Sequence, residues 1–353
     1  MSPVDENKLQ DLVGKVLVDL GGAASVPLAR LGRKHGLYRN LHVSGPATAN
    51  ELADRLGLAA RYVREWLCAQ AASGYVQFDP KTGRFSLSPE QVMVFVDEDS
   101  PVHLLPAFET AWCMAENFDK VSAAFESGQG VAWGDQPSNL FRAVARFFRP
   151  GYVYNLIDEW IPSLAGVHDR LIAGGRVADI GCGYGHSTVL MAQAYPQSHF
   201  MGYDFHEESI LEARKHAQQW HLGKRVRFET AAVKDIADTD FDLVTCFDCL
   251  HDMGDPVGAA AHVKSILKPD GVWMIVEPMA ADALEDNLNP VSRFYYAAST
   301  MICVPTSLSQ EKGMALGAQA GEKALTAVIK AGGFRRVRRV AQTPFNMVLE
   351  ARP

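Results

Sequence analysis

The chain has 353 residues, of which 48% are hydrophobic and 21% charged, and its 34 basic and 41 acidic residues give a formal net charge of -7. This length is enough to bury a sizeable core and to form two domains. The acidic balance argues against broad affinity for nucleic acid, which depends on neutralising phosphates with Lys and Arg. No uninterrupted apolar run approaches the ~20 residues of a membrane helix, and the N-terminus lacks the basic segment of a signal peptide. We therefore expect a cytoplasmic protein that binds neither nucleic acid nor a membrane.

The six cysteines are scattered along the chain rather than grouped. Cys246 and Cys249 form a single C-x-x-C, but it lies in an apolar, strand-like segment, and a structural zinc site of this type needs a second pair. The pattern favours buried, reduced thiols, and we predict no metal site.

Apolar residues recur at helical spacing over the first ~40 residues. They predict two amphipathic helices, with Val13, Val16, Leu17 and Leu20 in the first and Leu28, Leu31, Leu37 and Leu41 in the second.

The next segment has the pattern of a winged helix. Thr48 can cap a helix with Glu51 three residues on, and Gly57 ends that helix. A second helix follows from about Ala59 to Ser73. The residues YVQFDPKTGRFSLS after it predict a β-hairpin, because two alternating segments flank a turn rich in Asp, Pro and Gly.

A winged helix can bind DNA through its second helix, or it can serve as a packing and dimerisation module. The second helix offers Arg61 and Arg64, but also Glu65 and Trp66. The phosphate contacts on which DNA affinity depends would be few. We therefore predict a dimerisation domain over residues 1–98, and DNA binding remains the alternative.

A helical segment over residues 99–165 carries many aromatic residues and methionine. Most of these side chains are expected in the core, while Trp112 or Trp133 could line a pocket for an apolar small molecule. The loop from Gly128 to Pro137 could act as a lid. This segment is predicted to link the two domains and to contribute to the substrate pocket.

From Arg176 onward, strand and helix patterns alternate, which is typical of an α/β fold with a doubly wound parallel sheet. The sequence RVADIGCGYG gives a strand with Asp179 near its end, followed by Gly181, Gly183 and Gly185. Glycines let a ligand approach the main chain closely. Dinucleotide folds use G-x-G-x-x-G, whereas the spacing here is G-x-G-x-G.

This motif resembles the first motif of class I S-adenosylmethionine (SAM) dependent methyltransferases. With the winged helix, the chain resembles the small-molecule O-methyltransferases whose N-terminal winged-helix domain pairs two subunits. The resemblance implies a Rossmann-like sheet with its last strand antiparallel, a SAM-binding domain over residues 166–353, SAM as the cofactor and a homodimer. A segment at 280–321, rich in aromatic residues and methionine, would form a substrate cap or pack on a partner subunit.

The resemblance also implies a set of cofactor contacts. Asp204 closes the second strand and can accept hydrogen bonds from both ribose hydroxyls, although it could instead cap the next helix. Phe205 would stack near the adenine. The adenine often meets an acid at the position of Ala232, so here we expect backbone contacts or a substitute in Asp235. The predicted contacts are Asp179, Gly181, Cys182, Gly183, Gly185, Asp204, Phe205, Ala232, Val233, Phe247 and Asp248.

The segment CLHDMGDP resembles the L-H-D-W-x-D segment of these O-methyltransferases, in which the histidine is the general base. An imidazole can take the proton of a hydroxyl acceptor at neutral pH, so His251 is the predicted base. It could instead cap the strand end. Glu277 occupies the position of the glutamate that orients the histidine. Met253 replaces the tryptophan of the motif.

A second carboxylate of that family falls near Gln319 here, so either Glu322 takes its place or the base is supported on one side only. The predicted function is transfer of a methyl group from SAM to a small, apolar or aromatic acceptor at a hydroxyl. Methyl transfer to nitrogen or carbon is the first alternative. A SAM-responsive DNA-binding regulator and a nicotinamide oxidoreductase are the others.

Overall fold

The computed structural model describes residues 4–353, which form two compact units, one up to Trp112 and one from Cys113 to Pro353. The elements of the first unit are α1 (Glu6–Lys34), α2 (Leu37–Val43), α3 (Ala49–Leu56), α4 (Ala60–Ala72), β1 (Gln77–Asp79), β2 (Arg84–Ser86) and α5 (Pro89–Phe95). The boundary between the units falls within α6 (Leu105–Glu116).

The predicted winged helix is confirmed within the first unit. Thr48 and Glu51 form the capping box that begins α3, and Gly57 ends it in a left-handed conformation with φ of 64°. Strands β1 and β2 pair antiparallel to form the wing. Glu51 also binds Arg84 of the wing at 2.6 Å, so the residue that caps α3 also ties this helix to the hairpin.

The first helix is longer than the sequence predicted. The apolar residues from Val13 to Leu31, predicted to belong to two helices, all lie on the single 29-residue helix α1. Pro27 lies inside this helix without ending it. The break comes at Gly36, whose φ of 68° cannot continue a helix. The N-terminal half of α1 is exposed in the isolated chain, and its apolar residues recur every three or four positions: Leu9, Leu12, Val13, Val16, Leu17 and Leu20.

By length and composition, α1 is also the one helix of residues 4–353 that could cross a membrane. Only 11% of its most apolar stretch of 18 residues is buried in the protein. This helix was not foreseen as a membrane candidate, because Lys15 and Asp19 interrupt its apolar residues. These two side chains form an i,i+4 ion pair at 3.3 Å.

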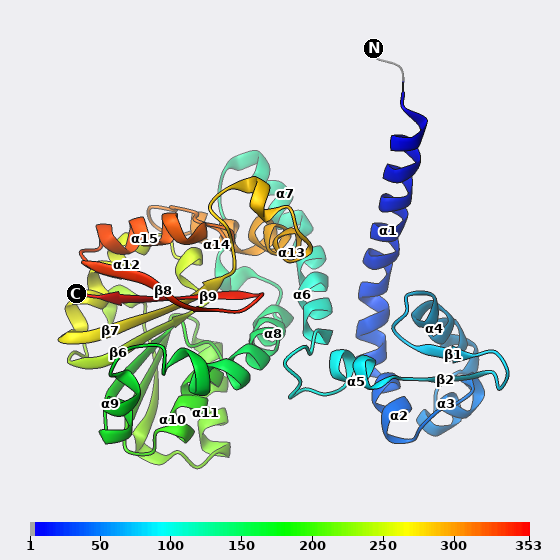
Figure 1. Cartoon of the computed structure of the whole chain (residues 1–353), viewed down its shortest axis with the longest axis horizontal. Helices are drawn as coiled ribbons and strands as arrows, with labels where there is room; N and C mark the ends of the chain where they lie inside the picture. Colours follow the sequence, from blue (N-terminus) through cyan, green and yellow to red (C-terminus); the bar gives the residue numbers. More distant parts are fainter. Residues whose placement is uncertain (1–3) are drawn as a thin grey trace. The chain divides into compact units, whose positions relative to one another are not determined.

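The second unit contains a seven-stranded sheet with the order β5-β4-β3-β6-β7-β9-β8 (Figure 1). The strands are β3 (Arg176–Ile180), β4 (His199–Asp204), β5 (Val226–Thr230), β6 (Phe241–Phe247), β7 (Leu267–Pro278), β8 (Arg336–Gln342) and β9 (Asn346–Arg352). β3 to β7 pair in parallel, whereas β9 inserts antiparallel between β7 and β8. The predicted doubly wound α/β sheet with an antiparallel last strand is confirmed.

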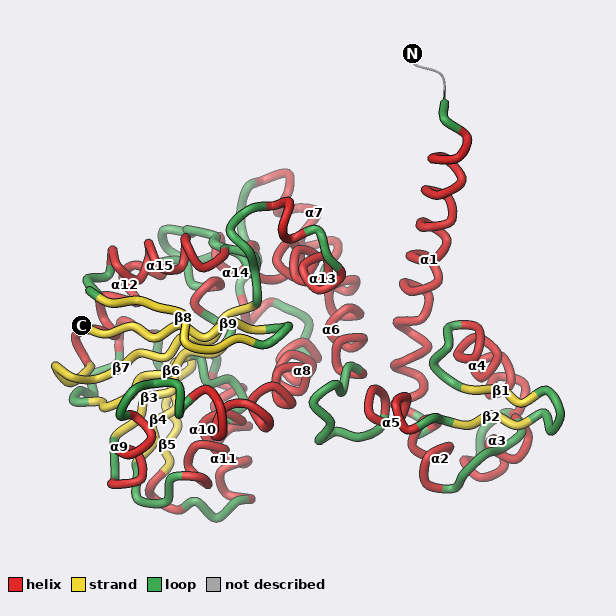
Figure 2. The backbone as a smooth tube through the Cα atoms, viewed as in Figure 1, coloured by secondary structure: helices red, strands yellow, loops and turns green. Residues whose placement is uncertain are grey.

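Helices cover both faces of this sheet (Figures 1 and 2). One face packs against α8 (Asn139–Asn155), α9 (Val167–Ala173), α10 (His186–Ala194) and α11 (Glu207–Gln219), and the other against α12 (Pro256–Ile266) and α15 (Gly321–Ala331). Each face has its own apolar core. Because both faces are covered, the strand residues of β6 are all buried, and the ligand-accessible edge is the one where the parallel strands end.

The remaining helices of the second unit are α7 (Phe118–Ser127), α13 (Pro290–Ala298) and α14 (Val304–Leu308), with the π-helical segment η7 (Ser299–Cys303) between the last two. The loop predicted as a lid packs against α14: the Val131 N–H donates to the Pro305 carbonyl at 2.9 Å. A Cβ at Gly130 would lie 2.1 Å from the Ser309 nitrogen. This close approach requires glycine.

Candidate functional site

The glycine loop leaves the carboxyl end of β3 and leads into α10. Gly181, Gly183 and Gly185 all have positive φ, at 67°, 50° and 73°. A Cβ at Gly181 would lie 2.6 Å from Cys249 Sγ, and one at Gly185 would lie 2.7 Å from the Phe228 ring. Backbone conformation therefore favours glycine at all three positions, and close packing also requires it at Gly181 and Gly185.

Asp179 lies behind this loop rather than in front of it. Its side chain is fully buried and accepts hydrogen bonds from the hydroxyls of Ser187 at 2.7 Å, Thr188 at 2.5 Å and Thr245 at 2.8 Å. Burial raises the pKa of Asp179, although these hydrogen bonds oppose the shift. Asp179 thus fixes the start of α10 and the loop that precedes it.

Asp204 ends β4 and faces the loop. Its carboxylate accepts the Gly183 N–H at 2.9 Å and the His206 N–H at 2.9 Å. Burial raises the pKa of Asp204 above the usual range, against the effect of these two backbone donors. The side chain is 8% exposed and lines the main cavity.

The main cavity of the second unit has a volume of about 730 Å³, within the range of small-molecule sites. Most of the predicted cofactor contacts line it: Gly181, Cys182, Gly183, Asp204, Phe205, Ala232, Val233, Phe247 and Asp248. The predicted contacts Asp179 and Gly185 do not line the cavity. Asp235 does not line the cavity either, whereas Ala232 and Val233 do.

The rest of the cavity wall includes four aromatic side chains of residues 133–152: Trp133, Phe141, Phe148 and Tyr152. The 280–321 segment, predicted to contribute aromatic residues and methionine, lines the cavity only with polar side chains: Thr306, Gln310, Glu311 and Lys312. Trp112 does not line the cavity. Instead, the Arg30 guanidinium lies over the Trp112 ring, 4.6 Å from the ring centroid.

Asp248 occupies the turn after β6 with φ of 51°. Its carboxylate accepts hydrogen bonds from the Tyr152 hydroxyl at 3.2 Å and the Asn346 amide at 2.7 Å. Burial and the charge of Glu277 raise the pKa of Asp248 well above its usual range. Tyr152 and Asn346 were not foreseen as site residues, because their partner is about a hundred positions away in the chain.

His251 and Glu277 form the predicted pair. His251 lies on the short turn η5 (Leu250–Asp252), and its Nδ1 is 2.5 Å from Glu277 Oε2. Glu277 Oε1 accepts the Leu250 N–H at 2.9 Å. Both side chains are buried, with exposures of 4% and 1%. The glutamate therefore fixes both the ring of His251 and the turn that carries it.

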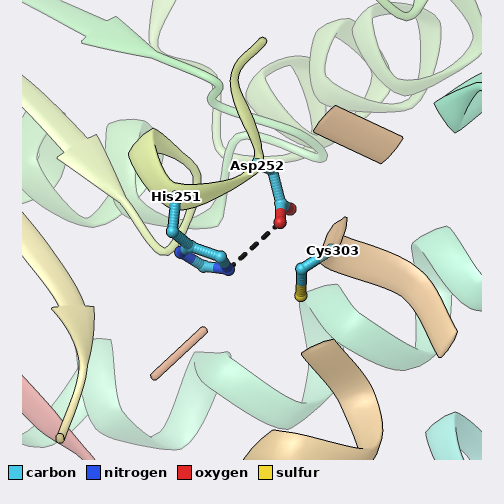
Figure 3. A group of neighbouring side chains, drawn as sticks. All are labelled: His251, Asp252 and Cys303. Carbon is cyan, nitrogen blue, oxygen red and sulfur yellow. Dashed lines mark ion pairs between the residues drawn. The ribbon is translucent and has the colours of Figure 1, made fainter. Parts of the chain in front are cut away.

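Two further groups lie against the other side of the imidazole (Figure 3). His251 Nε2 is 3.1 Å from Asp252 Oδ1, and Cys303 Sγ lies beside them. Burial alone would lower the pKa of His251, but the carboxylates of Asp252 and Glu277 raise it well above the usual range. Burial and Asp252 raise the pKa of the Cys303 thiol to about 12. A raised pKa stabilises the imidazolium that forms when His251 takes a proton, and it also lowers the fraction of His251 that is free to accept one at neutral pH.

The second carboxylate near this histidine is Asp252. Asp252 belongs to the CLHDMGDP motif, but it was not predicted to support the base. The Gln319 amide donates to the Met279 carbonyl at 3.1 Å, and Glu322 pairs with Arg339 at 3.1 Å. Neither therefore supports the base. Asp252 lines the main cavity, whereas His251 and Cys303 do not.

Two family models match the chain. Residues 172–332 match a methyltransferase domain, and residues 23–96 match an Rv2258c-like winged HTH domain. The chain carries a class I SAM-dependent methyltransferase domain. With the winged helix before it, this domain confirms the predicted enzyme class, a SAM-dependent methyltransferase, and SAM as its cofactor.

Curated relatives match part of the chain. It is 29% identical over 180 residues to the ubiquinone biosynthesis O-methyltransferase of Bordetella avium, covering 50% of this chain and 65% of the relative. It is 33% identical over 128 residues to the protein of the same name from Aromatoleum aromaticum, covering 35% and 51%. The chain thus spans between half and two thirds of these relatives.

Solved structures match nearly the whole chain. The human N-acetylserotonin methyltransferase in complex with SAM covers 99% of this chain and 98% of its own, with 14% identity and a TM-score of 0.69. The mitomycin 7-O-methyltransferase MmcR covers 99% and 100%, with 18% identity and a TM-score of 0.64. PigF with S-adenosylhomocysteine covers 99% and 100%, with 15% identity and a TM-score of 0.72. At these identities the likeness establishes the fold.

Proposed function

We propose that the protein transfers the methyl group of SAM to a hydroxyl of a small, apolar or aromatic molecule. The observation that carries this proposal is the buried His251–Glu277 pair, whose histidine is next in the chain to Asp252, which lines the same cavity as the glycine loop. A base held by a carboxylate is needed where the acceptor must lose a proton. The names of the relatives, O-methyltransferases of several small molecules, support the same acceptor atom.

SAM supplies a methyl group already activated on its sulfonium, so the protein mainly has to align and desolvate the acceptor. The residues fit this ligand: glycine backbone at Gly181 and Gly183 permits close approach, and the Asp204 carboxylate can accept from ribose hydroxyls. The aromatic wall at Phe141 and Phe148 excludes water from the acceptor. His251 takes the acceptor's proton at Nε2, because Glu277 occupies Nδ1.

The experiment that tests this acceptor assignment is methyl transfer from labelled SAM to matched panels of phenols, their methyl ethers, anilines and carbon acids. We expect product with the free phenols and none with the ethers. Transfer to anilines but to no hydroxyl would contradict O-methylation and favour the nitrogen alternative. Binding of NAD but not of S-adenosylhomocysteine in calorimetry would contradict the cofactor.

We also propose that two copies associate through the first unit. The exposed apolar stripe of α1, which includes Val16 and Leu17 at 46% and 62% exposure, is a surface that a second copy of the same helix can cover. Winged-helix O-methyltransferases of the predicted family pair through this domain. The proposed location is the cytoplasm, because all six cysteines are free thiols, as a reducing compartment keeps them.

Sedimentation equilibrium of the full chain tests the dimer. We expect a dimer for the unmodified protein and a shift toward monomer for Leu17→Glu, with unchanged far-ultraviolet circular dichroism. A monomer in the unmodified protein would refute the proposal. Flotation of the unmodified protein with neutral and anionic vesicles would show instead that α1 inserts into a membrane.

A further inference from the structure

We propose that His251, Asp252 and Cys303 bind a thiophilic divalent metal ion of the zinc type. The three side chains offer an imidazole nitrogen, a carboxylate oxygen and a sulfur, and these atoms all lie within 4.8 Å of one another (Figure 3). Zn²⁺ takes such ligands in a tetrahedral arrangement with metal–ligand distances of about 2.0–2.3 Å. The binding itself is independent of the proposed methyl-transfer reaction.

The alignment of two of the donors, rather than their separation, is what a hydrogen bond does not account for. Tetrahedral ligands at those bond lengths stand roughly 3.3–3.7 Å apart, and His251 Nε2 lies 3.1 Å from Asp252 Oδ1. That oxygen is buried yet has no hydrogen-bond partner, so the close approach lacks the alignment of a hydrogen bond. A metal ion between the two groups would satisfy both.

Glu277 prepares the imidazole for this role. It binds Nδ1 at 2.5 Å, which leaves Nε2 to present its lone pair toward Asp252 and Cys303. Metal-binding histidines almost always donate their other ring N–H to a carboxylate, a backbone carbonyl or a water, and removing that partner typically weakens metal affinity 10- to 100-fold. The site therefore has three donors and an orienting group behind the histidine.

The site also has an entry path and a chemical preference. Asp252 lines the main cavity, so an ion can reach it from there, while Cys303 comes from η7 and closes the opposite side. A thiolate with an imidazole favours zinc over magnesium or calcium, which prefer oxygen ligands. On binding, the Cys303 thiol and the protonated His251 Nε2 each release a proton to water.

A metal at this site would occupy Nε2, the atom proposed to take the acceptor's proton. Zinc should therefore inhibit methyl transfer reversibly, with the rate restored by a chelator. This consequence rests on the proposed function. A water or an acceptor hydroxyl from the cavity would supply the fourth ligand that a tetrahedral ion needs.

The test uses the full chain with Co²⁺ as a spectroscopic substitute for zinc, without SAM or acceptor. We expect one bound Co²⁺ with a sulfur-to-cobalt charge-transfer band that Zn²⁺ abolishes and Mg²⁺ leaves unchanged. Cys303→Ser should lose the band. Cys68→Ser, which changes an exposed thiol in the first unit, and Cys249→Ser should keep it. Glu277→Gln should weaken cobalt affinity about 10- to 100-fold.

Two results would overturn the proposal. One is the absence of a charge-transfer band in the unmodified protein at cobalt concentrations that saturate ordinary zinc sites. The other is a band that survives Cys303→Ser but disappears in Cys249→Ser, which would place the metal at the Cys246–Cys249 pair, whose sulfurs are 2.9 Å apart. Methyl transfer measured with a chelator present tests the proposed function separately, because no metal then occupies His251.

Discussion

Substitution of Glu277 by glutamine should disable the proposed base while leaving the cofactor site intact. The glutamate serves two donors, the Leu250 N–H at 2.9 Å and His251 Nδ1 at 2.5 Å. An amide has one accepting oxygen, so one donor must face the NH₂ group. Either the turn at Leu250 loses its acceptor, or the NH₂ donates to Nδ1 and moves the ring proton to Nε2, where it blocks acceptance of the substrate proton.

The expected loss is large. The corresponding carboxylate-to-amide change in a serine protease triad lowers kcat about 10⁴-fold through the wrong tautomer, and general-base catalysis as a whole contributes ~10²–10⁴. We therefore expect kcat to fall about 100- to 10,000-fold. Loss of a buried hydrogen bond to a charged group should also cost about 1.5–3 kcal/mol of folding stability.

The assay is methyl transfer at saturating SAM, with affinity for S-adenosylhomocysteine measured by calorimetry. Glu350→Gln is the matched control, because Glu350 is also buried in the sheet, pairs with Arg338 and Arg352, and does not line the main cavity. We expect the control to lose stability but keep its kcat. A Glu277→Gln enzyme with full kcat would refute the orienting role.

Three further outcomes follow from the same geometry. Asp204→Asn should weaken binding of S-adenosylhomocysteine about tenfold or more, since hydrogen bonds to charged groups contribute ~1.5–3 kcal/mol; unchanged affinity in calorimetry would contradict the ribose contact. Gly181→Ala should lower the melting temperature more than Gly183→Ala. Both positions have positive φ, but only a Cβ at position 181 would meet a neighbouring atom, Cys249 Sγ at 2.6 Å. Equal melting temperatures would show that the glycine loop shifts to make room for the Cβ. The Arg352 and Arg338 guanidiniums outweigh the effect of burial and lower the pKa of Glu350. These ion pairs therefore stabilise the folded protein above the pKa that Glu350 has in the unfolded chain, and they weaken as the pH falls. Thermal melts from pH 7 to pH 3 should show a smaller loss of melting temperature in Glu350→Gln than in the unmodified chain.

Most of the fold could be predicted from local patterns. The capping box at Thr48 and Glu51, the hairpin turn and the strand–helix alternation after Arg176 each set structure within a few residues. The end of α1 could not be predicted in the same way. Its apolar residues have helical spacing throughout, and only the left-handed conformation of Gly36 marks the break.

The site could be predicted only where a motif carried it. The glycine loop, Asp204, His251 and Glu277 lie at or just after the carboxyl ends of strands, and the carboxyl ends of parallel strands meet at one edge of the sheet. Cys303 lies on a π-helical segment far along the chain, and no local pattern indicates that it approaches His251. Tyr152 and Asn346 reach Asp248 for the same reason: only the folded chain brings these distant residues together.

The most direct test of the central claim compares the unmodified enzyme with His251→Ala at neutral pH, in the presence of a chelator and saturating SAM. A phenol that the unmodified enzyme methylates serves as the acceptor, and affinity for S-adenosylhomocysteine is measured in parallel. The account predicts a fall in kcat of about 100-fold or more with unchanged affinity for S-adenosylhomocysteine. A full rate in His251→Ala would contradict it, because the hydroxyl would then lose its proton without the imidazole.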